Sequence, residues 1–148
     1  MINFKLDQDK FNDLKTKYKI IKINSDNFKY SYRLIIDSIK YFNSEIEWDG
    51  MFDFNTAHKR ISSGMTMYVG MMDSDVFGHV WFRDENKSRY LFNLFVRNII
   101  PEKNYTGKEF LSHVISKYEF NKSILCEVDE WNEKSIKLFK RLGFEEIL

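Results

Sequence analysis

Residues 89–128 constrain the fold of this chain more than any other stretch. Residues 89–96 predict a strand, and residues 106–119 predict a helix with one apolar face, formed by Phe110, Leu111, Val114, Ile115 and Tyr118. Residues 123–128, SILCEV, are a short and nearly continuous apolar run, which predicts a strand buried on both faces. Strands joined by a crossover helix lie parallel in one sheet, so the sequence predicts a parallel pair.

Three strands in succession are predicted before that helix. They cover residues 65–72, 76–83 and 89–96, and short polar turns separate them. Antiparallel strands with tight turns need no crossover, so we expect a meander. Gly78 lies inside the middle strand, where a bulge or a close packing contact is the usual reason. His79 beside it is expected to be structural.

The rest of the pattern predicts an α/β fold with a mixed sheet. The chain begins with a predicted short helix. A predicted strand follows it, another predicted strand ends the chain, and further helices are predicted between the two. Helices are expected at 9–17, 27–42, 56–63 and from Asn132 to about residue 142, with strands at 18–24 and 144–148. We therefore expect one domain, residues 1–148, with residues 1–17 as an N-terminal helical extension. Its central sheet would combine the antiparallel meander with the parallel pair and carry helices on both faces.

Composition excludes several classes of partner. The 148 residues include 23 basic and 22 acidic side chains, and the net charge of +1 is too weak to attract nucleic acid or an anionic membrane. The single cysteine, Cys126, excludes an internal disulfide and fits a reducing compartment. The N-terminus is too polar for a signal peptide, and no apolar run approaches the about 20 residues needed to span a bilayer. We expect a cytoplasmic protein.

The stretch from Tyr105 to Leu111, YTGKEFL, joins the end of a strand to the start of a helix. Unpaired N–H groups and the positive end of the helix dipole attract anions, and Gly107 lets a ligand approach the backbone. Thr106 and Glu109 also have the spacing of a capping box, which satisfies the same N–H groups without a ligand. The residues alone leave both interpretations open.

A second candidate for binding is the acidic and aromatic segment 43–55. Its four carboxylates stand among Trp48, Met51, Phe52 and Phe54, with neither strand nor helix periodicity. The carboxylates are Glu45, Glu47, Asp49 and Asp53. Such a segment either folds over a ligand or is a loop held by its own aromatic rings.

The C-terminal part, NEKSIKLFKRLGF, resembles a late helix of the GNAT superfamily of acyl-CoA-dependent N-acetyltransferases. That helix reads approximately N-x-x-(A/S)-x-x-(L/F)-(Y/F)-x-x-x-G-F, and this chain matches it with Asn132, Ser135, Leu138, Phe139, Gly143 and Phe144. The order of predicted elements is similar to that family as well, and YTGKEFL looks like the end of its pyrophosphate loop. The loop departs from the family where Glu102 and Tyr105 replace a Gln/Arg and a glycine.

The resemblance implies an enzyme that transfers an acetyl group from acetyl-CoA to a primary amine of a small molecule or protein by direct attack in a ternary complex, without a metal. It places the thioester carbonyl on an N–H near Phe95 or Val96. The other implied CoA-binding residues are Lys103, Asn104, Tyr105, Thr106, Gly107, Lys108, Asn132, Ser135 and Phe139. The alternative is a GNAT-fold protein that no longer catalyses and serves as a binding or regulatory module.

The catalytic groups and the acceptor site follow from the same resemblance. Phe139 stands where the family often has a tyrosine proton donor, so Ser135 is the substitute, and Glu127 is the candidate base. An ion pair at the strand end is the other role open to Glu127. The acceptor would bind under the acidic segment at Glu47, Trp48, Asp49 and Phe52. The family adds a seventh strand after the terminal one, so an open sheet edge and a homodimer are expected.

Overall fold

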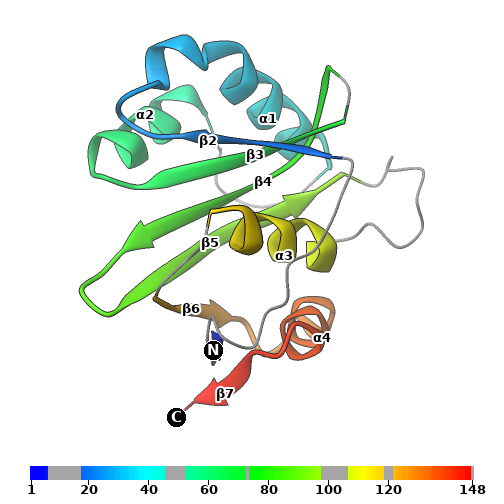
Figure 1. Cartoon of the computed structure of the whole chain (residues 1–148). Helices are drawn as coiled ribbons and strands as arrows, with labels where there is room; N and C mark the ends of the chain where they lie inside the picture. Colours follow the sequence, from blue (N-terminus) through cyan, green and yellow to red (C-terminus); the bar gives the residue numbers. More distant parts are fainter. Residues whose placement is uncertain (7–17, 46–52, 73, 98–106, 119–121, 148) are drawn as a thin grey trace.

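The computed structural model describes residues 1–6, 18–45, 53–72, 74–97, 107–118 and 122–147. Their centre is a seven-stranded sheet in the order β2-β3-β4-β5-β6-β1-β7 (Figure 1). Its strands are β1 (Ile2–Leu6), β2 (Lys19–Ile23), β3 (Thr66–Met72), β4 (Asp75–Asp84), β5 (Ser88–Val96), β6 (Ser123–Val128) and β7 (Glu145–Ile147). The predicted meander β3-β4-β5 and the predicted parallel pair β5-β6 are both confirmed.

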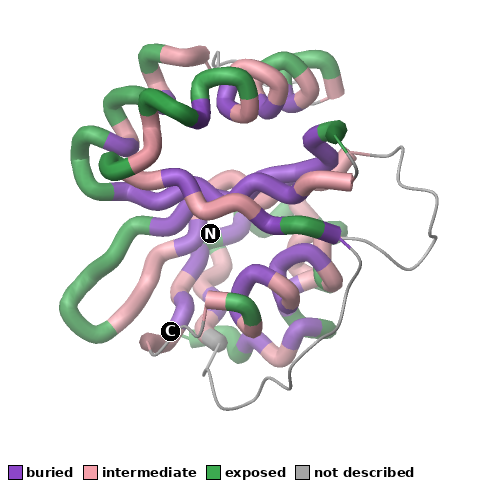
Figure 2. Tube along the Cα trace, turned by 45° about the horizontal axis from the view of Figure 1, so that its top comes forward, coloured by how far each residue is buried: buried purple, intermediate pink, exposed green. Residues whose placement is uncertain are grey.

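Helices cover both faces of the sheet, as the sequence predicts. On one face lie α1 (Tyr32–Glu45) and α2 (Phe54–Ser62), and on the other lie α3 (Gly107–Lys117) and α4 (Glu133–Arg141) (Figure 1). The buried chain is concentrated in the strands between these two helical layers (Figure 2). Two separate apolar cores result, because each face of the sheet packs against its own helices.

Helix α1 begins later than predicted. Residues 28–30 form a 3-10 turn, and α1 begins four residues after Phe28, at Tyr32. Asn27 explains the delay, because its side chain accepts from the N–H of Asn24 and donates to the carbonyl of Lys22, which holds a turn there. The helix expected at 9–17 lies outside the described residues.

The N-terminal strand β1 was not expected from the sequence. It lies between β6 and β7 and pairs antiparallel with both. The alternation of apolar and polar residues in INFKL is the strand signal, and the polar stretch that follows it concealed so short an element. Strand β1 fills one side of the terminal strand β7, and β7 itself lies at the edge of the sheet.

Strand β6 is buried on one face only, which corrects the expectation of burial on both. Ile124, Cys126 and Val128 are buried under α3 and α4, whereas Glu127 is exposed. The helices α1 and α2 pack on β3 and β4 of the opposite face. Glu127 therefore does not occupy a desolvated position.

Candidate active site

A cleft opens where the parallel pair comes apart. Strands β5 and β6 pair over only three residues, from Ser88 with Ser123 to Tyr90 with Leu125. Beyond this point β5 continues to Val96 and a cavity of about 370 Å³ separates the strands, within the usual size of ligand pockets. Its lining is Met1, Tyr90, Leu91, Phe92, Asn93, Leu94, Cys126, Glu127, Val128, Asp129, Asn132, Ser135, Leu138 and Phe139.

A bulge in β5 turns backbone groups toward the cleft. The pairing of β5 with β4 gains one residue between Phe92 and Phe95, and Asn93 has a φ of 46°. Bulged residues leave the ladder, which frees local N–H and C=O groups from strand pairing. On the far side Gly78 lies so close that a Cβ there would be 2.5 Å from the carbonyl oxygen of Phe95. The close packing contact expected at Gly78 is confirmed.

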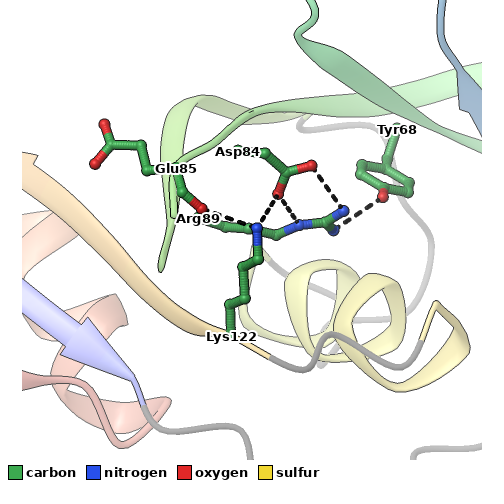
Figure 3. Close-up of polar contacts among 5 residues, drawn as sticks. All are labelled: Tyr68, Asp84, Glu85, Arg89 and Lys122. Carbon is green, nitrogen blue, oxygen red and sulfur yellow. Dashed lines mark hydrogen bonds and ion pairs between the residues drawn. The ribbon is translucent and has the colours of Figure 1, made fainter. Parts of the chain in front are cut away.

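A polar cluster holds the closed end of the parallel pair (Figure 3). Arg89 donates from Nε to Asp84 Oδ1 at 2.6 Å and from Nη1 to the hydroxyl of Tyr68 at 3.3 Å. Lys122, just before β6, donates to the carbonyl of Glu85 at 2.8 Å and lies 3.8 Å from Asp84. This cluster ties the β4-β5 hairpin to the start of β6, so the strands are fixed at one end and separate at the other.

Two side chains of the cleft interact across it. The phenol of Tyr90 on β5 and the carboxylate of Glu127 on β6 lie within hydrogen-bonding reach of one another. Burial raises the pKa of the Tyr90 phenol, and the hydrogen bond and negative charge of Glu127 raise it further. The phenol therefore keeps its proton at neutral pH and stays beside the Glu127 carboxylate.

The Tyr90–Glu127 pair lies on the same face of the sheet as helices α1 and α2. Phe92 is the register partner of Trp81, whose side chain packs in the core under α1 and α2. Side chains two residues apart on a strand share a face, which places Tyr90 with Phe92. Tyr90 is opposite Leu125, and Glu127 follows two residues later. The other face of the cleft carries Cys126 and the side chains of α4.

Helix α4 forms the other wall of the cleft. Asn132 caps it, because its Oδ1 accepts from the N–H of Ser135 at 3.2 Å. Ser135 is half-buried and lines the cavity. Phe139 also lines the cavity, but its ring is buried against Phe4 and Phe144, at centroid distances of 5.9 and 5.0 Å. It is a wall of the cleft and cannot donate a proton.

The predicted pyrophosphate loop lies mostly outside the described residues, which include neither Lys103, Asn104, Tyr105 nor Thr106. Gly107 is the first residue of α3, and a Cβ there would meet Leu138 at 3.3 Å and Leu94 at 3.5 Å. Both leucines line the cavity, so the N-terminus of α3 borders the cleft. Lys108 is exposed. The side chain of Phe95 is buried against Phe42, Val96 ends β5, and neither residue is part of the cavity lining.

The acidic segment is divided by the structure. Glu45 accepts from Arg97 Nε at 3.2 Å, and Asp53 caps α2 by accepting from the N–H of Thr56 at 2.8 Å. The cap holds the pKa of Asp53 below its usual value, because its carboxylate accepts from the Thr56 N–H and hydroxyl. Both carboxylates are engaged within the protein, which corrects the expectation that all four face an acceptor. Glu47, Trp48, Asp49 and Phe52 lie outside the described residues.

The two remaining candidate groups are inert. Burial raises the pKa of the Cys126 thiol to about 12, so this cavity residue stays protonated and is a poor nucleophile. His79 is buried between the rings of Phe42 and Phe95, and burial lowers its pKa to about 3. In the described part of the chain, no three His, Cys, Asp or Glu side chains converge as metal ligands would.

The cavity lining includes Glu127 and the α4 residues that the sequence analysis named, and it also includes Tyr90, which the sequence analysis did not name. The sequence predicts the strand at residues 89–96 and its pairing with residues 123–128. The sequence does not predict the register of this pairing, which places Tyr90 opposite Leu125 and within reach of Glu127. A bulge also shifts the register of β5 against β4 by one residue between Phe92 and Phe95, and nothing in the local residue types indicates it.

Comparison with known proteins agrees on the fold. No protein-family model and no curated protein matches the sequence. A functionally unknown conserved protein from Staphylococcus epidermidis is similar in structure, with a TM-score of 0.64 and 13% identity over 99% of this chain. An aminoglycoside acetyltransferase from an uncultured soil metagenomic sample has a TM-score of 0.62 and 14% identity, over 88% of this chain and 91% of its own. The chain spans 57% of the length of the Staphylococcus protein.

A third similar structure contains a CoA compound. It is Naa50 of Arabidopsis thaliana in complex with the bisubstrate analogue CoA-Ac-MVNAL, with a TM-score of 0.58 and 19% identity over 88% of this chain and 84% of that one. The chain therefore has the fold of the GNAT superfamily of acetyltransferases, as the resemblance in its sequence implied. Among the helices described, none is long and apolar enough to cross a membrane.

Proposed function

We propose that this protein is an acetyl-CoA-dependent N-acetyltransferase that acts on a primary amine. One observation carries the proposal: the cleft between β5 and β6 holds a Tyr90–Glu127 pair on the face opposite α4. The apolar side chains of Leu94 and Leu138 suit the thioester arm, which would enter from the side of α3 and α4. The amine would enter from the opposite side and meet Glu127.

The reaction proposed is a direct transfer. The amine nitrogen attacks the thioester carbonyl carbon, a C–N bond forms, and the C–S bond breaks as sulfur leaves with its electron pair. Glu127 takes the proton that the nitrogen loses, and Tyr90 holds the carboxylate in place for this step. A covalent acetyl-cysteine route is not supported, because Cys126 is a buried thiol with a raised pKa.

The departing thiolate needs no strong acid in this proposal. A thiol has an ordinary pKa of about 8.5, so the thiolate leaves readily and takes its proton from solvent. A phenol with a raised pKa is a poor proton donor, which excludes Tyr90 from that role. The hydroxyl of Ser135 lines the cleft on the cofactor side and would donate a hydrogen bond to the sulfur.

Kinetics of three variants test the proposal. Glu127→Gln should lower kcat/KM by about 100-fold or more, the effect of losing a general base. Tyr90→Phe should lower it by about tenfold, because a hydrogen bond to a charged group is lost. Glu130→Gln is the matched control, since Glu130 is an exposed carboxylate outside the cavity lining. Equal activity of Glu127→Gln and the control would remove Glu127 from the mechanism.

The alternative function, a catalytically degenerate binding module, is favoured by Phe139, which replaces a proton donor with a buried ring. A thermal unfolding assay separates the two. Acetyl-CoA at about 100 times its Kd should stabilise the folded state by about 2.7 kcal/mol. Stabilisation without thiol release on a panel of amines would support the binding module, and no stabilisation by any acyl-CoA would overturn the enzyme.

A homodimer is a further part of the proposal. The edge strand β7 exposes Ile147, an apolar side chain that pairing between two copies would cover. Glu145 and Glu146 on the same strand are exposed and oppose such pairing, because like charges would meet at the edge. Sedimentation velocity at several protein concentrations decides between monomer and dimer.

A further inference from the structure

Arg83 lies beside the Tyr90–Glu127 pair, on the face through which the amine would enter. It is the register partner of Tyr90 on the neighbouring strand β4. Its guanidinium carbon is 5.3 Å from the centre of the Tyr90 ring and 5.2 Å from the centre of the Phe92 ring. Both rings line the cleft, so a fixed positive charge stands at the acceptor side of the cavity.

The guanidinium retains hydrogen-bonding capacity for a ligand. Among the described residues its one hydrogen-bonded partner is Glu85, which accepts from Nη2 at 2.9 Å. Both side chains of this ion pair are about half exposed, at 50% and 42%. Exposed pairs contribute little stability, so a carboxylate on a ligand can replace Glu85 at small cost. The two rings meanwhile hold the guanidinium plane, and its fork of N–H donors matches a carboxylate.

The charges around the Tyr90–Glu127 pair favour an acceptor with one cationic end and one anionic end. Glu127 and Asp129 line the cleft and favour a cationic or amine end. Arg83 lies across the Tyr90 ring from that end and favours an anionic one. Other cations described on this face are placed elsewhere: Arg60 lies over the Trp81 ring, Arg97 donates to Glu45 of α1, and Lys5 is opposite the oppositely charged Glu145 on β7. Arg83 is therefore the cation that adjoins the aromatic wall of the cleft.

We infer that the acceptor is a small amino acid, a primary amine that carries a carboxylate a few bonds from its nitrogen, and that Arg83 determines this specificity by binding the carboxylate. The amine meets Glu127, the intervening carbons lie over Tyr90 and Phe92, and the carboxylate reaches the guanidinium. This inference rests on the proposed function, because it names the acceptor for the same cleft.

The test compares amino acids with their own amides. Acetyl transfer is measured for glycine, β-alanine and 4-aminobutanoate and for the three corresponding carboxamides, and the ratio of kcat/KM between acid and amide is recorded for each pair. Arg83→Gln should lower this ratio by about tenfold or more, through a higher KM for the acid, because it removes a charge-assisted hydrogen-bonded pair. Arg83→Lys should lower it less, since lysine keeps the charge without the fork.

Two further variants sharpen the result. Glu85→Gln should raise the ratio, because it removes the carboxylate that competes for Arg83. Lys87→Gln removes an exposed charge from the same β4-β5 hairpin and should leave the ratio unchanged. A ratio that Arg83→Gln does not alter, or a preference for a diamine such as putrescine over every amino acid, would overturn the inference.

Failure of the inference is distinguishable from failure of the proposed function. Stabilisation by acetyl-CoA in thermal unfolding reports on the cofactor side of the cleft and does not involve Arg83. If acetyl-CoA stabilises the protein and the amides or diamines are acetylated while the amino acids are not, the acceptor assignment is wrong and the enzyme stands. If acetyl-CoA does not bind, the proposed function itself is overturned.

Discussion

Gly78 shows how closely single residues constrain the cleft. A Cβ at this position would be 2.5 Å from the Phe95 carbonyl oxygen and 3.3 Å from the Val96 Cα, so the backbone of β5 would have to move. Gly107 differs, because its Cβ would meet the flexible ends of two side chains, Leu138 at 3.3 Å and Leu94 at 3.5 Å. The two glycines therefore tolerate a methyl group unequally.

We predict that Gly78→Ala lowers the free energy of unfolding by about 1–3 kcal/mol, the usual cost of forcing an extra group into a packed site. Gly107→Ala should change it by less than about 1 kcal/mol, since alanine also favours the helix. Urea unfolding of both variants gives the comparison. Equal losses of stability would show that the β5 backbone yields easily to the added methyl group.

His79 makes stability depend on pH. Burial lowers its folded pKa to about 3, and the positive charge of Arg60 contributes to the same direction, whereas the unfolded value is 6.5. Above pH 6.5 the imidazole is neutral in both states and adds no dependence. Below it the unfolded chain takes up a proton that the folded protein does not, so stability falls by about 1.4 kcal/mol per pH unit until the folded pKa is reached.

His79→Gln should therefore unfold with a smaller loss of stability than the original protein as pH falls from 6.5 to about 4. The measurement is urea unfolding at several pH values, with His58→Gln as the control, since His58 is exposed. The two variants are compared by the slope of the free energy of unfolding against pH, because the other titrating groups are the same in both. Parallel slopes would mean that His79 takes up a proton within the folded protein.

At the scale of elements, the polar cluster at the start of the parallel pair decides where the cleft begins. The three-residue ladder between β5 and β6 is short, and Arg89 and Lys122 bind the same carboxylate, Asp84, from either strand. The side chain of Arg89 is 17% exposed, whereas that of Lys122 is 31% exposed. The more buried partner should matter more.

We predict that Arg89→Met lowers the free energy of unfolding by about 1–3 kcal/mol, because it removes the guanidinium that donates to Asp84 and to the Tyr68 hydroxyl. Lys122→Met should cost less than about 1 kcal/mol, as exposed ion pairs do. Arg33→Met is a control, since the Arg33–Asp37 pair is long, at 3.9 Å, and exposed. Equal losses in all three variants would exclude a special role for the cluster.

At the scale of the whole molecule, β1 joins the two ends of the chain. Phe4 is fully buried, packs on Phe139 of α4 and is opposite Cys126. Both strands that pair with β1, β6 and β7, belong to the C-terminal quarter of the chain, so β1 cannot join the sheet until those strands have formed. Contacts between such distant residues form late, because they require the closure of a long loop.

Phe4→Ala should destabilise the protein by about 3–5 kcal/mol, the usual cost of removing a buried phenyl ring. Most of that loss should appear as faster unfolding with little change in the folding rate, because β1 docks after the transition state. Stopped-flow measurements in urea provide both rates. A folding rate reduced in proportion to the lost stability would place β1 in the folding nucleus instead.

The sequence by itself determined the elements and their partnership along most of the chain. Periodicity located the meander, the crossover helix and the α4 helix, because residues that share a face repeat at fixed intervals in strands and helices. The resemblance carried by Asn132 to Phe144 also placed the α4 wall of the cleft correctly. These are local properties, which neighbouring residues express directly.

Only the tertiary structure decided the chemistry of the site. The Tyr90–Glu127 pair depends on the register of β5 against β6. The bulge at Asn93 interrupts β5 where that strand lines the cleft. The engagement of Glu45 by Arg97, and the position of β1 beside β6, join residues that are far apart in the chain. Such contacts arise from packing between elements, and a residue's neighbours in sequence do not report which partner it will meet in space.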